Sequence, residues 1–381
     1  MKNKINGLFF PLVATLFLCA LLLTSNKLYS DYYGFEILIA FISFLNVLIL
    51  PLILTIAINK IYLLIIFFHI LMVLISTSYN FMSFPHALFY INLLLFFLVV
   101  LPSLNNSFTS FVRLLKFINN VIVILVSIFV ILNLNLYLDF SFFASKDQYF
   151  KLLSNPNSIG FLVYVGFSVS LLLLTVEKEK IYRCYLFYYA VSLVLIPPVL
   201  TAYVSIFCYF FLFVFFKAKG LLRFFLITTV GLSLVFGVYS FSVAFEEFRF
   251  LLSYRDVLFL NSFDKIAAAP IFGYGIENWG YLFLDMKNPH NFFLYQFLSF
   301  GVLGAVFYFL IFLWVAHIAY QKYRNSERSN FYLHILIQII VCLMVMSVFV
   351  SMPGNYQDIS ILLSIIVAVF FNASLRINTS S

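Results

Sequence analysis

The segment PIFGYGIENWGYLFLDMKNPHNFFLYQFLSFGVLG, residues 270–304, passes from polar sequence into a long apolar run. Its first part closes the longest stretch of the chain that is too polar to cross a bilayer, from about Ser240 to Asn291. Each helical span of a membrane requires about 20 consecutive, mostly apolar residues. We therefore expect the chain to leave the membrane over 241–290 and to re-enter it at residue 291.

The composition outside this segment is that of a membrane protein. Hydrophobic residues make up 64% of the chain and charged residues only 9%, with a mean hydropathy of +1.09. In soluble globular proteins about a quarter of the residues are charged. The four cysteines are scattered without CxxC pairs or accompanying histidines, so they indicate neither a disulfide framework nor a zinc site. We expect an all-α bundle of transmembrane helices that forms one integral membrane domain over residues 1–381.

The apolar runs predict about 12 spans. Prolines 197 and 198 leave it open whether the two spans around them are one broken span. The first run lacks a small-residue cleavage site, which favours a membrane span over a signal peptide. The predicted spans are 8–24, 36–58, 61–77, 86–102, 117–137, 158–175, 184–198, 201–216, 221–240, 291–316, 331–350 and 359–375.

The basic residues predict the orientation of these spans. Of the 22 Lys and Arg residues, 15 fall in one set of alternate loops and 7 in the other. Loops rich in Lys and Arg remain in the cytoplasm. We therefore expect both termini inside and the 241–290 loop outside. The net charge of +8 is spread over these short loops, so it indicates topology and not nucleic-acid binding.

The loops assigned to the cytoplasm carry no recognisable catalytic motif. They contain no glycine-rich P-loop, no DxD pair and no HExxH sequence, which are the usual means of holding a nucleotide phosphate or a metal. We therefore expect no metal and no cofactor. If the protein is an enzyme, its substrate reaches the outer face already activated.

The outward loop contains two arginines and a glycine-containing turn. Arg249 and Arg255 carry permanent charges with a planar fork that fits phosphate oxygens, which suits a lipid-linked diphosphate. An alternative is that they pair with nearby carboxylates or with lipid headgroups. The two glycines of Pro270-Ile-Phe-Gly-Tyr-Gly275 permit positive φ angles or a close approach to a partner. As a phosphate cradle, such a turn is a weak signal.

His290 is the histidine with the most aqueous surroundings, since it lies between polar residues where the chain re-enters the membrane. An imidazole that titrates near neutral pH can accept a proton from a sugar hydroxyl. The other four histidines are expected to be packed or interfacial. Asn155-Pro-Asn-Ser158, at the mouth of another span, either caps the next helix or contributes to the site. Further along, Gly301 and Gly304 have the spacing that permits close helix packing.

These motifs, in this order, resemble the O-antigen ligase and Wzy-type polymerase superfamily. The resemblance covers roughly residues 150–375. It rests on Arg255, on the turn 270–275, and on Pro289-His-Asn-Phe-Phe-Leu294 followed by Phe300-Gly-Val-Leu-Gly304. Asn155-Pro-Asn157 is similar to a further feature of the family.

The resemblance implies a glycosyltransferase of the bacterial inner membrane that acts on its periplasmic face, without metal. Sugar chains pass from undecaprenyl diphosphate to an acceptor hydroxyl, and a chain-length regulator is an expected partner. His290 would activate the acceptor, and Arg255 would bind the donor diphosphate. We also assign Arg249, Asn291, Tyr274 and Asn157 to substrate binding.

The chain differs from the family in one motif, and this difference bears on whether it is a polymerase or a ligase. Many members, and the ligases in particular, have a Ser-Arg pair near the outer end of a middle span, where this chain reads Leu200-Thr-Ala-Tyr-Val-Ser205. Tyr203, Lys146 or Lys151 are candidates to replace that arginine. The departure favours a polymerase that joins repeat units over a ligase that acts on lipid A-core. A flippase for lipid-linked sugars is a third interpretation, but the sequence lacks mid-membrane charges and a repeat of spans.

Overall fold

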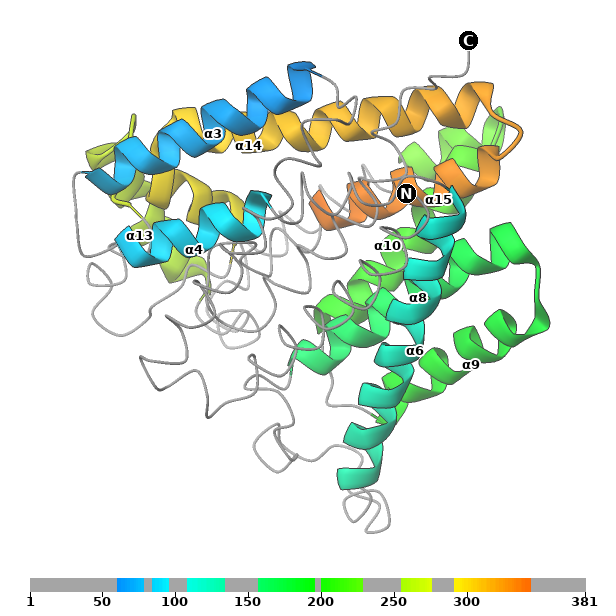
Figure 1. The fold of residues 1–381 in the computed structure, drawn as a ribbon. Helices are drawn as coiled ribbons and strands as arrows, with labels where there is room; N and C mark the ends of the chain where they lie inside the picture. Colours follow the sequence, from blue (N-terminus) through cyan, green and yellow to red (C-terminus); the bar gives the residue numbers. More distant parts are fainter. Residues whose placement is uncertain are drawn as a thin grey trace, which may run out of the picture.

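A computed structural model describes residues 60–78, 84–95, 108–133, 157–195, 200–228, 255–275 and 291–343. Within these ranges the regular elements are all helices, as expected from the composition. Figure 1 labels α3 (Lys60–Ser78), α4 (Phe84–Leu95), α6 (Phe108–Leu132), α8 (Asn157–Glu177), α9 (Lys180–Leu195), α10 (Leu200–Lys217), α13 (Arg255–Ala268), α14 (Phe292–Asn325) and α15 (Ser329–Val341).

Three of the described helices are long and apolar enough to cross a membrane. These segments are Lys60–Ser78, Phe111–Leu132 and Phe293–Asn325. Many large apolar side chains on them are exposed, as expected for surfaces in contact with lipid. The protein is therefore a helical membrane protein. The predicted spans 8–24, 36–58 and 359–375 lie outside the described residues.

The helices α9 and α10, on either side of the two prolines, are separate. Helix α9 ends at Leu195 and α10 begins at Leu200. The first turn of α9 lies beside the end of α8, where the Tyr182 hydroxyl donates to Glu177. At the last residue of α10, the Lys217 side chain donates a hydrogen bond to Asn330 of α15. Both of these contacts belong to the same end of the bundle, so the two helices run in opposite directions and are not one broken span.

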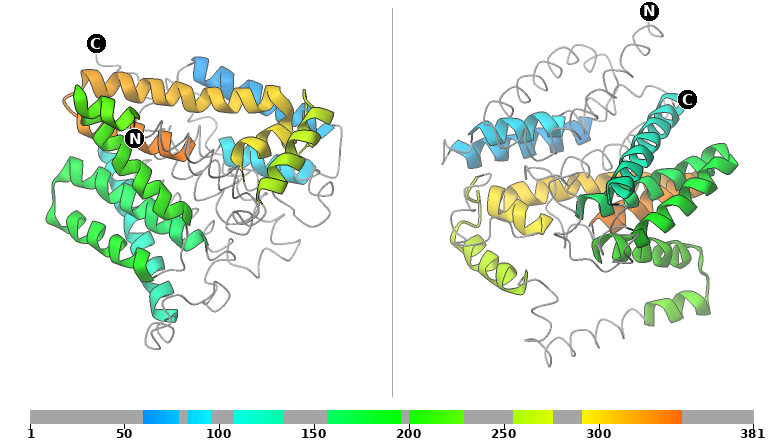
Figure 2. Two further views of the ribbon diagram at one scale, coloured as in Figure 1. Left: turned by 180° about the vertical axis from the view of Figure 1, so that it is seen from behind. Right: turned by 90° about the horizontal axis from the view of Figure 1, so that it is seen from below.

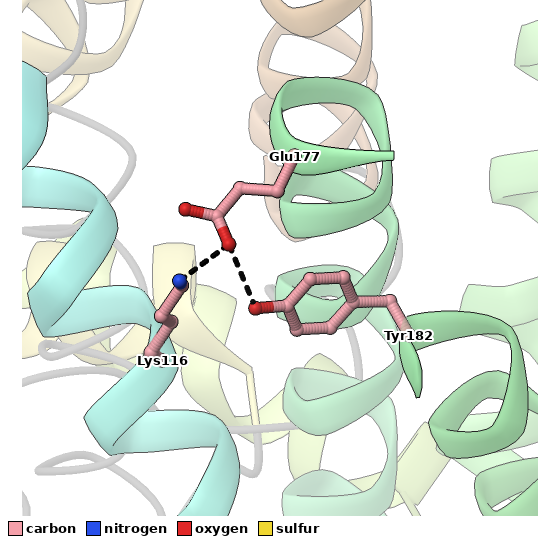
Figure 3. Close-up of polar contacts among 3 residues, drawn as sticks. All are labelled: Lys116, Glu177 and Tyr182. Carbon is pink, nitrogen blue, oxygen red and sulfur yellow. Dashed lines mark hydrogen bonds and ion pairs between the residues drawn. The ribbon is translucent and has the colours of Figure 1, made fainter. Parts of the chain in front are cut away.

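That shared end gathers basic residues from several helices. Lys116 of α6 forms an ion pair with Glu177 of α8, to which the Tyr182 hydroxyl of α9 also donates at 3.2 Å (Figure 3). The hydrogen bond from Lys116 is the main reason that the pKa of Glu177 lies below its ordinary value. One ionic cluster thus joins three helices.

Two further contacts bring α14 and α15 to this end. The Arg328 guanidinium lies 3.8 Å from the centre of the Phe108 ring, at the start of α6. The Lys217 ammonium at the end of α10 donates to the Asn330 side chain at 2.8 Å. We call this region the basic end. It brings together loops that the sequence assigns to the cytoplasm.

Helix α8 is the centre of the larger core. Its described side chains are buried on nearly all sides, and the buried Tyr164, Ser168 and Ser170 each donate a hydrogen bond. Ser170 donates to Asn119 of α6 at 2.9 Å, and Tyr164 donates to Gln338 of α15. Because unpaired polar groups are costly in an apolar interior, these pairs fix how the helices pack against one another.

Candidate functional site

Helix α14 is broken at Gly301. This glycine has φ 65° and ψ −171°, which is not a helical conformation. Figure 1 shows α14 as a short segment and a long segment that meet at a bend beside α3, and the views in Figure 2 show the same two segments from behind and from below. We call Phe292–Phe300 the short arm and Val302–Asn325 the long arm.

The two arms fold back toward each other. The ring centroids of Phe293 and Phe309 are 5.9 Å apart. In a straight helix, residues that are 16 positions apart would be separated by about 24 Å along the axis. Because the two phenylalanines lie at equal distances in sequence from Gly301, α14 is a helical hairpin whose tip is Gly301.

The turn 270–275 closes over this tip through three backbone hydrogen bonds. The Val302 amide donates to the Pro270 carbonyl at 2.8 Å. In return, the amides of Tyr274 and Gly275 donate to the carbonyls of Leu298 and Ser299, at 2.7 and 2.9 Å. A helix break leaves amides and carbonyls without their usual partners, which is costly in a membrane. The turn supplies those partners, and we call this arrangement the clasp.

The glycines of the turn permit the close approach. Gly273 and Gly275 have φ angles of 67° and 82°, as the sequence predicts. A Cβ on Gly273 would lie 2.6 Å from the Leu298 carbonyl oxygen. Because the amides of Gly273, Tyr274 and Gly275 already donate to backbone carbonyls, the turn clasps α14 and is not an open phosphate cradle.

Gly304 lies where Phe300 and helix α3 both come close to the long arm. A Cβ on Gly304 would overlap the Phe300 side chain, so this glycine makes room for Phe300 within the hairpin. The Phe300 ring in turn contacts the rings of His69 and Tyr90, at 5.5 and 5.3 Å between centroids. Gly304 also permits close packing against α3, as its spacing suggests, since a Cβ there would lie 3.7 Å from the Met72 side chain. Gly301 bends α14, and Gly304 accommodates an aromatic ring.

Helix α3 holds both arms from the other side. Ser76 donates to the Ser299 carbonyl of the short arm at 2.5 Å. One ring nitrogen of His69 lies 3.1 Å from the Gly304 carbonyl of the long arm, and the other lies 2.7 Å from the Tyr90 hydroxyl. His69 is completely buried, as expected for a packed histidine. These contacts and the clasp fix the hairpin from two sides.

Two of the predicted site residues lie at this hairpin with their side chains described. Asn291 is the N-cap of α14, and its side chain accepts the Leu294 amide hydrogen at 3.0 Å. Tyr274 donates to the Lys265 carbonyl at 2.9 Å and packs against Tyr295 and Leu298. Both residues have a structural role, and substrate contact by either one stays a prediction.

The other predicted site residues are described only in part or not at all. Arg255 is the first residue of α13, and Asn157 is the first residue of α8, where a helix start was expected. The positions of their side chains are not among the described features. His290 and Arg249 lie outside the described residues. What the structure brings together is α13, which begins at Arg255, and the short arm, which begins two residues after His290.

Residues 200–205, where the resembled ligases have a Ser-Arg pair, form the start of α10. The Tyr203 hydroxyl donates to the Leu193 carbonyl of α9 at 2.5 Å. Its single proton is therefore committed to the backbone, which does not favour Tyr203 as the replacement for an arginine. Lys146 and Lys151 lie outside the described residues.

Gln296 is a feature that the sequence did not single out as functional. It lies on the short arm with 1% of its surface exposed, and within the described part of the chain neither its amide oxygen nor its amide nitrogen has a hydrogen-bond partner. A buried amide without partners is rare in proteins and requires an explanation. The sequence could have indicated this residue, because it is a polar residue within the apolar run 291–304.

The chain matches no protein-family model, no curated protein and no solved structure. The resemblance to the ligase and polymerase superfamily therefore stays a proposal based on its motifs.

Proposed function

We propose that this protein is a polysaccharide polymerase of the bacterial inner membrane, with about 12 spans and both termini in the cytoplasm. It transfers a glycan from undecaprenyl diphosphate to a sugar hydroxyl of a lipid-linked repeat unit on the periplasmic face. One observation carries the proposal: the clasp joins the end of the α13 segment to the hairpin of α14. Arg255 is the first residue of α13, and in the sequence His290 comes two residues before α14 begins.

The proposed reaction is a substitution at the anomeric carbon of the donor. The acceptor hydroxyl loses its proton to the imidazole of His290 as its oxygen bonds to the anomeric carbon. The bond from that carbon to the diphosphate oxygen breaks, and undecaprenyl diphosphate leaves. Arg255 stabilises the negative charge on the leaving diphosphate. Since the donor is already activated, the reaction consumes no nucleotide.

The experiment replaces the chromosomal gene by His290→Ala or Arg255→Ala and examines lipopolysaccharide on gels. We expect each variant to insert into the membrane at a normal level and to lose long-chain polysaccharide. Single repeat units on lipid A-core would remain, because a polymerase is lost and ligation continues. A ligase variant would instead leave lipid A-core bare and accumulate lipid-linked chains. Long chains of normal length in both variants would contradict the proposal.

A flippase for lipid-linked sugars is the second candidate, and one observation favours it. Interrupted helices and buried ionisable side chains are common in transporters, and here α14 is broken beside the buried His69. Both features are already accounted for by packing, since the clasp and Tyr90 supply the required hydrogen bonds. A flippase would predict that loss of function leaves lipid-linked units on the cytoplasmic face.

A further inference from the structure

The length of the long arm of α14 indicates how deep in the membrane the residues of the site lie. At 1.5 Å per residue, Val302–Asn325 is about 36 Å long, enough to cross a hydrocarbon core of about 30 Å. One end carries Lys322 and Arg324 beside the basic end, so the tip at Gly301 lies near the opposite membrane surface. The long arm also bears a stripe of exposed apolar side chains suited to lipid contact, formed by Val302, Val306, Phe309 and Leu313.

The short arm begins below that surface. Phe309 lies eight residues along the long arm, or about 12 Å from the tip. Since the Phe293 ring packs against Phe309 at 5.9 Å, the start of the short arm lies near the same depth. The short arm is therefore a re-entrant helix, and its first residues lie within the membrane. The predicted span 291–316 lies within α14, and the bend at Gly301 turns the first nine residues of this helix back.

The start of this arm is suited to an anion. The aligned peptide dipoles of a helix give its N-terminus a partial positive charge, and exposed amide groups there bind phosphates. This effect is strongest where water is excluded, as in the interrupted helices of membrane transporters. Asn291 caps the helix by accepting one amide hydrogen. At this depth, an anion must be attached to a lipid to arrive in useful amounts.

Gln296 is the independent sign of a ligand. It lies five residues after Asn291, and long side chains on a helix lean toward its N-terminus. Its side chain is buried, and no described residue forms a hydrogen bond with its amide. Leaving a buried polar group unpaired is energetically costly, so a ligand that accepts a hydrogen bond from this amide would bind favourably. A phosphate oxygen is such an acceptor.

We propose that the N-terminal end of the short arm, together with Gln296, binds the phosphate group of a membrane-anchored phosphorylated lipid. This inference deepens the proposed function and rests on it for the identity of the lipid, a polyprenyl diphosphate. It assigns the diphosphate to a re-entrant helix in addition to Arg255. It also places the transfer reaction below the outer surface, where free sugar phosphates do not accumulate.

The test measures binding to the purified full-length protein in detergent. The three probes are farnesyl diphosphate, farnesol and inorganic pyrophosphate. We expect the native protein to bind farnesyl diphosphate at least roughly tenfold more tightly than either of the other two. Gln296→Leu should weaken farnesyl diphosphate binding by roughly tenfold or more. The matched control is Gln338→Leu, which alters another buried glutamine in the α8–α15 contact and should leave binding unchanged.

Three outcomes would overturn the inference. The first is unchanged affinity in Gln296→Leu, which would mean that this amide binds water. The second is equal affinity for pyrophosphate and farnesyl diphosphate, which would indicate a site for free phosphate. The third is native affinity in Gln296→Glu, which would exclude a phosphate at this position. This substitution keeps the side-chain shape and adds a negative charge that repels a phosphate. It also provides the test if Gln296→Leu does not fold.

The two proposals fail in different ways. If His290→Ala cells still made long polysaccharide while farnesyl diphosphate binding required Gln296, the polymerase proposal would fall and the lipid-phosphate site would stand. If polymer were lost in His290→Ala cells but binding were unaffected in Gln296→Leu, only the binding site would be wrong.

Discussion

Gly301 has a backbone conformation that only glycine adopts readily, and its missing side chain leaves room for the clasp. With φ 65° and ψ −171°, any other residue would be strained by about 1–3 kcal/mol. A Cβ at this position would also overlap the Ile271 carbonyl group. Both effects act on the same contact between the turn and the hairpin.

We therefore predict that Gly301→Ala destabilises the protein by about 3 kcal/mol or more and shortens the polysaccharide chains. Thermal unfolding in detergent measures the first effect, and gel analysis of the polysaccharide measures the second. Gly220→Ala is the matched control, since Gly220 also has a positive φ of 54° but a Cβ there would meet nothing within 4 Å. That variant should lose about 1 kcal/mol and keep full chain length. Equal losses in both variants would exclude a special role for the clasp.

The residues of this region show how far the sequence could be interpreted. Two glycines within Pro270–Gly275 indicated positive φ angles or a close approach to a partner, and the structure shows both. The pattern could not reveal what the turn approaches, because its partners Leu298 and Ser299 lie more than 20 residues away in sequence. A turn that binds a phosphate and a turn that binds a broken helix both need free amide hydrogens close to their partner, so the sequence pattern is the same for both.

At the scale of the helix, the hairpin of α14 makes a direct distance prediction. Cysteines placed at Phe293 and Phe309 in a cysteine-free background should be joined rapidly by a short bis-maleimide, because the two rings are in contact. Mass spectrometry detects the linked peptides. In a straight helix the same positions would be about 24 Å apart, out of reach of the reagent. The control pair of Phe293 and Tyr320, further along the long arm, should not be joined. Failure of the first pair to react would contradict the hairpin.

Helix positions followed from the sequence because apolar length decides them. The predicted span 61–77 corresponds to α3, and 201–216 corresponds to α10. The bend in α14 could not be predicted in this way. Residues 292–300 and 302–325 are apolar on both sides of Gly301, so hydropathy gives no boundary between them. The break depends on hydrogen bonds from a distant turn and from Ser76, which are properties of the folded chain.

At the scale of the whole molecule, the two ends of the bundle differ in chemistry. The basic end is held by pairs such as Lys116 with Glu177 and Arg328 with Phe108, which join helices and provide anchoring. The opposite end carries the hairpin, the clasp and the elements of the predicted site. This division fits the distribution of basic residues, from which the sequence assigned the first end to the cytoplasm. It also fits a protein that works on an activated substrate from one side only.

The central proposal is that this single chain lengthens a lipid-linked glycan at the hairpin end, using His290. The most direct measurement supplies the purified protein in detergent with lipid-linked repeat units extracted from a strain that lacks it. No nucleotide is added, and a metal chelator is present. We predict that the native protein forms a ladder of longer lipid-linked chains and that His290→Ala forms none. Detergent removes the two compartments that a flippase needs, so failure of the native protein to join any units, or equal ladders from both proteins, would contradict the proposal.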